Sequence, residues 1–282
     1  MSRHLGAFFA LTFATSWAIW GAMVASSTSI ETTVGLVLNV VATAGPSIAA
    51  LVVAAALGGG TLRRLLDSFS LDRVSPRWAL VAVLLPLGMI AVAIAVSVGA
   101  MGSSMPVVTV SVVGVLIVEF VRIVFLGGPL EEELGWRGFA LPRLQVGRSA
   151  FSASALLGFI WGVWHIPLYF VSGTGQHETG VASGPVFAIV AFVVWTIGLS
   201  ILFTWLFNQT RGSLIVVILF HAAVNLGAFV PAAVGSTGAA SFLYALVTWG
   251  VALVVAARLG REHLASISRV VAAVPEVAPT AA

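Results

Sequence analysis

Three consecutive carboxylates, Glu131, Glu132 and Glu133, lie in a chain in which only 8% of residues are charged. An ionisable side chain inside a membrane span costs about 2.5–3.5 kcal/mol on insertion scales, so each one is expected to have a partner or a function. Arg137 follows Glu133 by four residues, which is the spacing of an ion pair on one helix face. Glu132 would point about 100° away from Glu133 on the same helix. The pattern therefore predicts one paired carboxylate and one that is free to face a cavity.

A simpler explanation is that the acids only occupy the first turn of a new helix at the membrane edge. Gly127-Gly128-Pro129 is expected to end the preceding helix, and a proline followed by acids suits a helix start. This explanation accounts for Glu131. It leaves open why Glu132 and Glu133 precede the dense run Gly135-Trp136-Arg137-Gly138.

Two histidines lie in apolar runs far apart in the sequence, and both could work with the free carboxylate. A lone buried histidine is more often a hydrogen-bonded packing residue than a functional one. However, Asn225 follows His221 by one helical turn and points the same way. A carboxylate can take a proton from water, an imidazole can help to hold that water, and a histidine with an asparagine can donate to a developing oxyanion. These residue types therefore indicate hydrolysis.

The same groups allow a second mechanism, in which Glu132, His165 and His221 hold a zinc ion with an open position for water. Spacing alone leaves metal-free and zinc-dependent hydrolysis open. Other catalytic classes are excluded by composition, because the chain has no cysteine and its two aspartates, Asp67 and Asp72, lie outside the apolar runs. No nucleophile-elbow or Walker motif occurs either.

The elements that must position these residues are membrane spans. Hydrophobic side chains make up 60% of the chain and the mean hydropathy is +1.10, whereas soluble domains average about 45–50% apolar residues. A spanning helix needs roughly 20 apolar residues. Eight segments qualify: 5–26, 34–57, 78–101, 107–127, 149–171, 185–207, 213–234 and 238–257. We therefore predict an all-α, polytopic membrane helix bundle of about eight transmembrane helices.

The arginines indicate the orientation of this bundle. All 13 basic residues are arginine, and 12 of them fall on the inner side when the N-terminus is placed inside. The exception, Arg122, follows Glu119 by three residues within the fourth span, where the two could form an internal ion pair. Because cytoplasmic loops carry an excess of basic residues, both termini are predicted to be cytoplasmic. The basic residues do not cluster with aromatics, so we expect the lipid bilayer, and no nucleic acid, as a partner.

The whole of residues 1–264 is predicted to form one transmembrane helical domain, with its motif-bearing part at about 115–230. Residues 61–77 alternate apolar and charged positions at near-helical spacing. This pattern predicts an amphipathic helix on the cytoplasmic face, where arginines meet anionic headgroups. Residues 265–282 are rich in Ala, Val and Pro and have little periodicity, which predicts a disordered tail.

The depths of the candidate residues in the membrane do not agree in this arrangement. Glu132 would lie near the inner edge of the membrane. His165 would lie about 16 residues into its span, or about 24 Å at 1.5 Å per residue. The two can meet only if the segment after Pro129 returns into the membrane, or if the fifth span starts later than residue 149.

Three motifs in this sequence, in this order, resemble those of a family of intramembrane endopeptidases. They are Glu132-Glu133-x-x-x-Arg137, Trp161-x-x-x-His165 and His221-x-x-x-Asn225. The family is the CAAX-protease and bacteriocin-processing family, which is related to the type II CAAX prenyl endopeptidase. The motifs together cover roughly residues 115–230, and their order on an eight-span chain is far more specific than any one of them.

The resemblance implies four catalytic residues. Glu132 would be the general base that activates water, and His165 would help to bind that water. His221 and Asn225 would stabilise the oxyanion. Three further residues would support the site: Glu133, Arg137 and Trp161. The family usually has phenylalanine where Trp161 stands, a departure that keeps an aromatic wall.

The predicted function is therefore an intramembrane endopeptidase that hydrolyses a peptide bond with a Glu/His-activated water. Its substrate would be a membrane-embedded peptide or protein, either prenylated or a precursor peptide. The protein would lie in a bacterial plasma membrane with its site open toward the cytoplasm. One alternative is a non-catalytic immunity or scaffold protein of the same fold, which would not need the acid. Another is a proton-coupled transporter, which usually shows an inverted repeat, a feature that the sequence lacks.

Overall fold

The structure is a computed structural model that describes residues 3–236 and 239–265, and every regular element in those ranges is a helix. Seven helical segments are long and apolar enough to cross a membrane, or eight if the bent pair α2 (Thr33–Thr43) and α3 (Gly45–Leu57) forms one span. The predicted all-α polytopic bundle is therefore confirmed, and the chain is an integral membrane protein. The orientation of the termini stays a prediction, and all but the first residue of the predicted tail lies outside the described residues.

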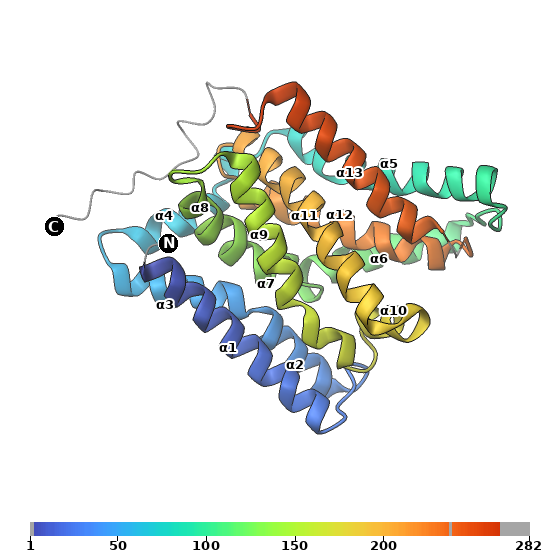
Figure 1. Cartoon of the computed structure of the whole chain (residues 1–282), viewed down its shortest axis with the longest axis horizontal. Coiled ribbons are helices and arrows are strands. Elements are labelled where there is room, and N and C mark those ends of the chain that lie inside the picture. Colours follow the sequence, from blue (N-terminus) through green and yellow to red (C-terminus); the bar gives the residue numbers. More distant parts are fainter. Residues whose placement is uncertain (1–2, 237–238, 266–282) are drawn as a thin grey trace.

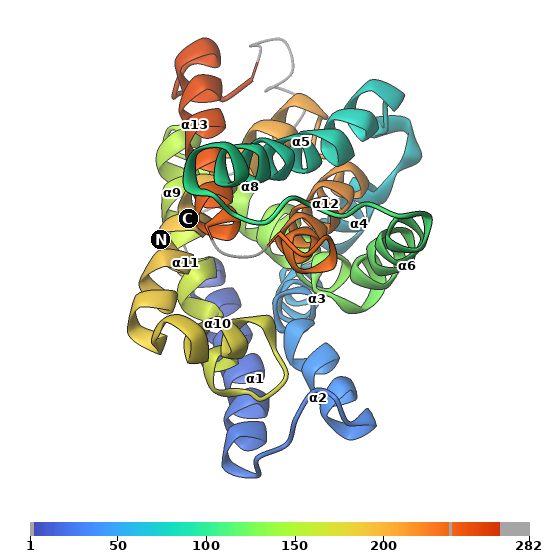
Figure 2. The ribbon, with the colours of Figure 1, turned by 90° about the vertical axis from the view of Figure 1, so that its right-hand side faces the viewer.

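The remaining elements follow α1 (Arg3–Ala25), α2 and α3 in chain order. They are α4 (Thr61–Leu66), η1 (Asp67–Phe69), η2 (Leu71–Arg73), α5 (Pro76–Met101), α6 (Val110–Leu126), α7 (Pro129–Glu133), η3 (Leu134–Ala140), α8 (Leu141–Gln145), α9 (Ala150–Trp164), η4 (Ile166–Phe170), α10 (Gly175–Ser183), α11 (Pro185–Gln209), α12 (Leu214–Ala233) and α13 (Ala240–Leu259). Figures 1 and 2 show α1 and α2 along one side of the bundle and α5 and α13 along the other. Helices α9, α11 and α12 lie between them.

The break between α2 and α3 follows from one proline. Pro46 lacks the N–H that would otherwise bond to the carbonyl of Ala42, four residues earlier. The hydroxyl of Ser16 on α1 donates to that carbonyl at 2.7 Å. Helix α1 can approach so closely because Gly45 has no side chain. A Cβ at this position would overlap the Ser16 hydroxyl. At this 43° bend, the Ala42 carbonyl therefore receives its hydrogen bond from a neighbouring helix, as apolar surroundings require.

The fourth predicted span is longer than residues 107–127. After α6, the chain breaks at Gly127-Gly128, where Gly128 has a φ of 104°, and then continues as α7, η3 and α8 to Gln145. Most of this continuation is buried, so the segment after Pro129 does run within the bundle. Glu132 lies thirteen residues before Gln145, the last residue of the apolar segment that begins at Val110. Glu132 therefore lies inside this longer apolar segment and not at its end, as a meeting with His165 requires.

Two local predictions are corrected. Residues 61–77 do not form one amphipathic helix, because α4 ends at Leu66 and is followed by two short turns, η1 and η2, before α5 starts at Pro76. The Ser68 hydroxyl donates to the Leu65 carbonyl, which competes with the helical bond of that carbonyl. The Glu119–Arg122 ion pair is present at 2.8 Å, but it is not internal, since the Arg122 side chain is 49% exposed.

Helix η3 is a π-helix that packs directly on α3. A Cβ at Gly135 would overlap the backbone carbonyl of Pro46, so only glycine allows this approach. Wider π turns often occur at functional sites. This close contact holds the acid-bearing segment against the N-terminal helices.

The substitution Gly135→Ala is expected to lower the stability of the protein by about 1–3 kcal/mol, because the added methyl forces α3 and η3 apart. The measurement is thermal unfolding in detergent micelles. The matched control is Gly88→Ala in α5, where a Cβ meets nothing within 4 Å. Equal unfolding temperatures for the two variants would contradict the close contact at Pro46.

Candidate active site

Glu133 is at the centre of a buried ionic network. Its Oε1 atom lies 2.8 Å from Arg137 Nη1 and 2.6 Å from His221 Nδ1. The Glu133 and Arg137 side chains are both 0% exposed, and His221 is buried with them. The same-face pair expected from the i,i+4 spacing is therefore present, and it reaches across to α12. One acid thus orients an imidazole from a helix 88 residues away in the sequence.

Arg137 is also held by aromatic rings. Its guanidinium carbon lies 4.5 Å from the centre of the Trp161 ring and 3.8 Å from that of Phe203. A cation over an aromatic face is attracted by the ring quadrupole, more strongly when both are desolvated. The arginine therefore joins the acids of α7 to α9 and α11.

Glu132 points to a different partner. Its Oε2 atom accepts a 2.7 Å hydrogen bond from Trp161 Nε1, and the residue is 3% exposed. Its Oε1 atom faces the break before α7, since a Cβ at Gly128 would overlap it. Glu131 is buried as well, so a helix start at the membrane edge does not explain the acids.

His165 ends α9 and lies beside the same tryptophan. Its Nδ1 atom is 2.7 Å from the carbonyl of Trp161. A carbonyl can only accept, so Nδ1 carries a hydrogen, and Nε2 of a neutral ring is left as an acceptor. The Trp161 ring centre lies 5.5 Å from that of His165 and 5.5 Å from that of His221, in edge-to-face geometry. Trp161 therefore contacts Glu132 and both imidazoles.

Asn225 lies one turn after His221 but has a partner outside this group. Its Nδ2 atom donates to the carbonyl of Gly127 at 3.1 Å. This bond satisfies a backbone group at the break between α6 and α7. The amide nitrogen has a second hydrogen, which this contact does not use.

The three residues predicted as zinc ligands are not gathered around one point. Among the described residues, no three His, Asp or Glu side chains come into position to share a metal ion. Glu132 and His165 are each bound to Trp161, and His221 is bound to Glu133. This arrangement does not fit a three-ligand zinc centre. A bound zinc ion stays a prediction, and the mechanism proposed below does not use one.

Two features of this site were not expected from the sequence. The indole N–H of Trp161 holds Glu132, whereas only an aromatic wall was expected there. Phe203 covers Arg137 and His221 from α11, a span to which no role was given. The tryptophan could have been noticed, since it is the aromatic residue of that motif that carries a donor. Phe203 offers no signal among the many apolar residues of its helix.

The fold and site define a polytopic helical membrane protein with a buried glutamate, histidine and arginine network. Comparison with known proteins shows which family the middle part of the chain resembles. Residues 114–227, which include all three motifs, match the model of the type II CAAX prenyl endopeptidase Rce1-like family. A stretch of 110 residues is 37% identical to CAAX prenyl protease 2 of Methanococcus maripaludis and covers 38% of this chain. The predicted family resemblance is confirmed for this part of the chain, which spans about 40% of the relative's length.

Proposed function

We propose that the protein is an intramembrane endopeptidase in which Glu132 activates a water molecule for attack on a peptide carbonyl. The observation that carries this proposal is the position of Trp161, which contacts Glu132, His165 and His221 at once. The match of this segment to a prenyl endopeptidase family supports the same reaction class.

The water is held by two acceptors. It donates one hydrogen to Glu132 and the other to Nε2 of His165, which leaves an oxygen lone pair directed at the carbonyl carbon. Trp161 anchors Oε2 of Glu132, so the carboxylate keeps one orientation while it takes the proton. This arrangement raises the nucleophilicity of the water without any covalent intermediate.

The oxyanion is stabilised from α12. Nδ1–H of His221 donates to Glu133, and the proposed mechanism requires a second proton on Nε2, so that Nε2–H donates to the developing charge. The second amide hydrogen of Asn225 adds a further donor. The C–N bond then breaks, the hydroxyl of the water stays on the acyl carbon, and Glu132 passes its proton to the leaving amine.

The substrate is a membrane-embedded peptide or protein, either prenylated or a precursor peptide. The name of the Methanococcus relative points to prenylated substrates for that protein. We propose that the site opens toward the cytoplasmic side of a bacterial plasma membrane; the arginine distribution supports the cytoplasmic placement of both termini. A peptide bond near a lipid anchor would be held at a depth that a buried site can reach.

A cleavage assay tests this function directly. The full chain in proteoliposomes is incubated with prenylated and with unmodified membrane peptides, and fragments are identified by mass spectrometry. Specific cleavage supports the protease, whereas intact peptides together with proton-coupled uptake support a transporter. Intact peptides without uptake support a scaffold or immunity protein. Metal analysis of the active protein, with and without chelator, decides between metal-free and zinc-dependent hydrolysis.

The substitution Trp161→Phe is expected to lower kcat about tenfold and leave KM unchanged. It removes the donor to Glu132, and a hydrogen bond to a charged group contributes about 1.5–3 kcal/mol. The ring that packs on both imidazoles is kept. Steady-state cleavage kinetics measure both constants, and Trp17→Phe in α1, whose indole N–H donates to the Trp164 carbonyl, is the matched control. A rise in KM with unchanged kcat would assign Trp161 to substrate binding instead.

A further inference from the structure

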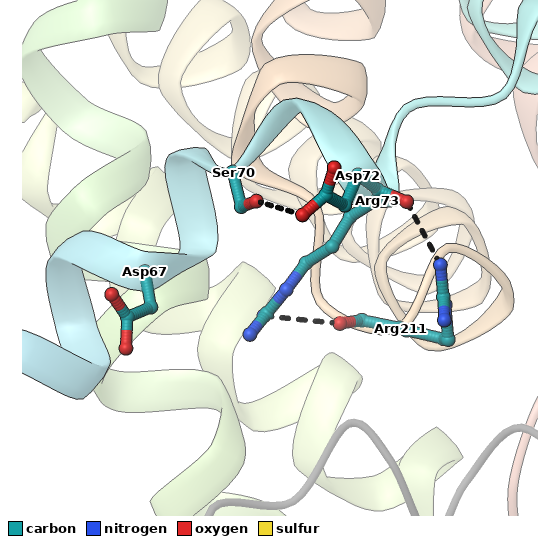
Figure 3. A pocket seen from close by; sticks show the side chains of 5 residues that line it. All are labelled: Asp67, Ser70, Asp72, Arg73 and Arg211. Carbon is teal, nitrogen blue, oxygen red and sulfur yellow. Dashed lines mark hydrogen bonds between the residues drawn. The ribbon is translucent and has the colours of Figure 1, made fainter.

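A polar pocket lies outside the Glu132 site, where the turns after α4 meet the turn between α11 and α12. It has a volume of about 380 Å³, within the range of about 300–1,000 Å³ typical of small-molecule sites. Figure 3 shows the five side chains that line it: Asp67, Ser70, Asp72, Arg73 and Arg211. None of them belongs to the Glu132 site, so the proposed proteolysis gives this pocket no role.

The two arginines hold each other's segments in place. Arg73 Nη1 donates to the carbonyl of Arg211 at 3.2 Å, and Arg211 Nη2 donates to the carbonyl of Asp72 at 2.9 Å (Figure 3). Arg211 has a φ of 55°, which is uncommon for a residue other than glycine. The reciprocal bonds therefore bring two cations from distant parts of the chain to one pocket.

The charges of the pocket are not paired with one another. Within the described residues, the ion pairs include neither Arg73 nor Arg211, although two aspartates line the same pocket. Each guanidinium uses one donor on a backbone carbonyl and keeps others. The Asp72 carboxylate accepts only a 3.4 Å bond from Ser70. Two cations and two anions are therefore available to a ligand that carries both signs of charge.

The residues around this pocket are of the kinds that are typical of a membrane interface. Helices α5, α11 and α12 all begin or end beside it, at Pro76, Gln209 and Leu214. Trp78 and Trp205 pack edge to face nearby, with ring centres 5.6 Å apart, and tryptophan is enriched at membrane interfaces. Two leucines of the same segment are exposed, Leu66 at 47% and Leu71 at 75%. Such leucines suit contact with acyl chains beside a charged pocket.

We propose that this pocket binds the headgroup of a phospholipid that carries both a phosphate and a primary ammonium group. The phosphate takes the free donors of Arg73 and Arg211, since guanidinium groups match phosphate oxygens in geometry and charge. The ammonium takes the carboxylates of Asp67 and Asp72. A purely anionic headgroup would meet these two acids, and free phosphate would leave them and the exposed leucines without a partner.

Native mass spectrometry of the full chain in detergent tests this site with three lipids: phosphatidylethanolamine, phosphatidylglycerol and phosphatidylcholine. The wild type is expected to bind phosphatidylethanolamine at least about fivefold more tightly than the other two. Arg73→Gln and Arg211→Gln are each expected to weaken this binding about tenfold, the loss typical of one charged hydrogen bond. Asp67→Asn removes the preference over phosphatidylglycerol. Arg63→Gln, at an exposed arginine outside the pocket, leaves binding unchanged.

Two soluble competitors separate a lipid site from a phosphate site. Inorganic phosphate and glycerophosphoethanolamine at millimolar concentration are expected to leave the lipid bound, because neither offers acyl chains. Complete displacement by inorganic phosphate would overturn the lipid assignment. Equal binding of the three lipids by the wild type would overturn it too, and that measurement does not depend on whether any variant folds.

Discussion

The substitution Glu132→Gln is expected to abolish cleavage, with kcat/KM lowered by about 10³-fold. The amide still accepts the Trp161 N–H bond, so the side chain keeps its place in the site. It cannot take a proton from water, and general base catalysis typically contributes about 10²–10⁴-fold. The measurement is the rate of peptide cleavage in proteoliposomes, with equal amounts of folded protein.

Glu178→Gln is the matched control for this prediction. Glu178 is exposed on α10 and lies outside the described site, so cleavage should be unchanged. Unfolding temperatures of both variants should match that of the wild type. Wild-type cleavage by Glu132→Gln would remove the proposed base and favour a function that does not need the acid.

The substitution Arg137→Met is expected to destabilise the protein by about 3–5 kcal/mol. Arg137 is fully buried, and its loss leaves the Glu133 carboxylate, in the core of the bundle, with His221 as its remaining partner among the described residues. Breaking a buried pair by removing one partner costs this much, because a charge is left uncompensated. Methionine roughly keeps the volume between the Trp161 and Phe203 rings, so the effect comes from charge more than from packing. Unfolding in mixed micelles, followed by circular dichroism, gives the free energy.

The double variant Glu133→Gln/Arg137→Met tests that reason. It removes both charges of the Glu133–Arg137 ion pair, so its loss of stability should be smaller than the sum of the two single losses. Arg64→Met, at an exposed arginine of α4, should cost less than about 1 kcal/mol. Additive losses in the double variant would mean that Glu133 and Arg137 act independently.

Much of the fold could be predicted because its signals are local. A run of about 20 apolar residues is a span whatever surrounds it, and the predicted spans agree in number with the seven or eight apolar helices of the structure. The i,i+4 spacing of Glu133 and Arg137 needs only one turn of helix to make a pair, and the pair is present. The predicted helix boundaries were wrong where weak local preferences compete. In residues 61–77, for example, the Ser68 hydroxyl donates to the Leu65 carbonyl where the helix ends.

The sequence by itself determined which residue types could hydrolyse a bond and in which motifs they lie. Only the tertiary structure decided which partner each one has. Glu132 is held by Trp161, His221 by Glu133, and Asn225 turns to the carbonyl of Gly127. The physical reason is that spacing along one helix sets which face a side chain occupies, whereas its partner depends on how separate helices cross. The chain beyond Gly128 stays within the bundle for the same reason, since Gly135 lets η3 pack against Pro46 of α3.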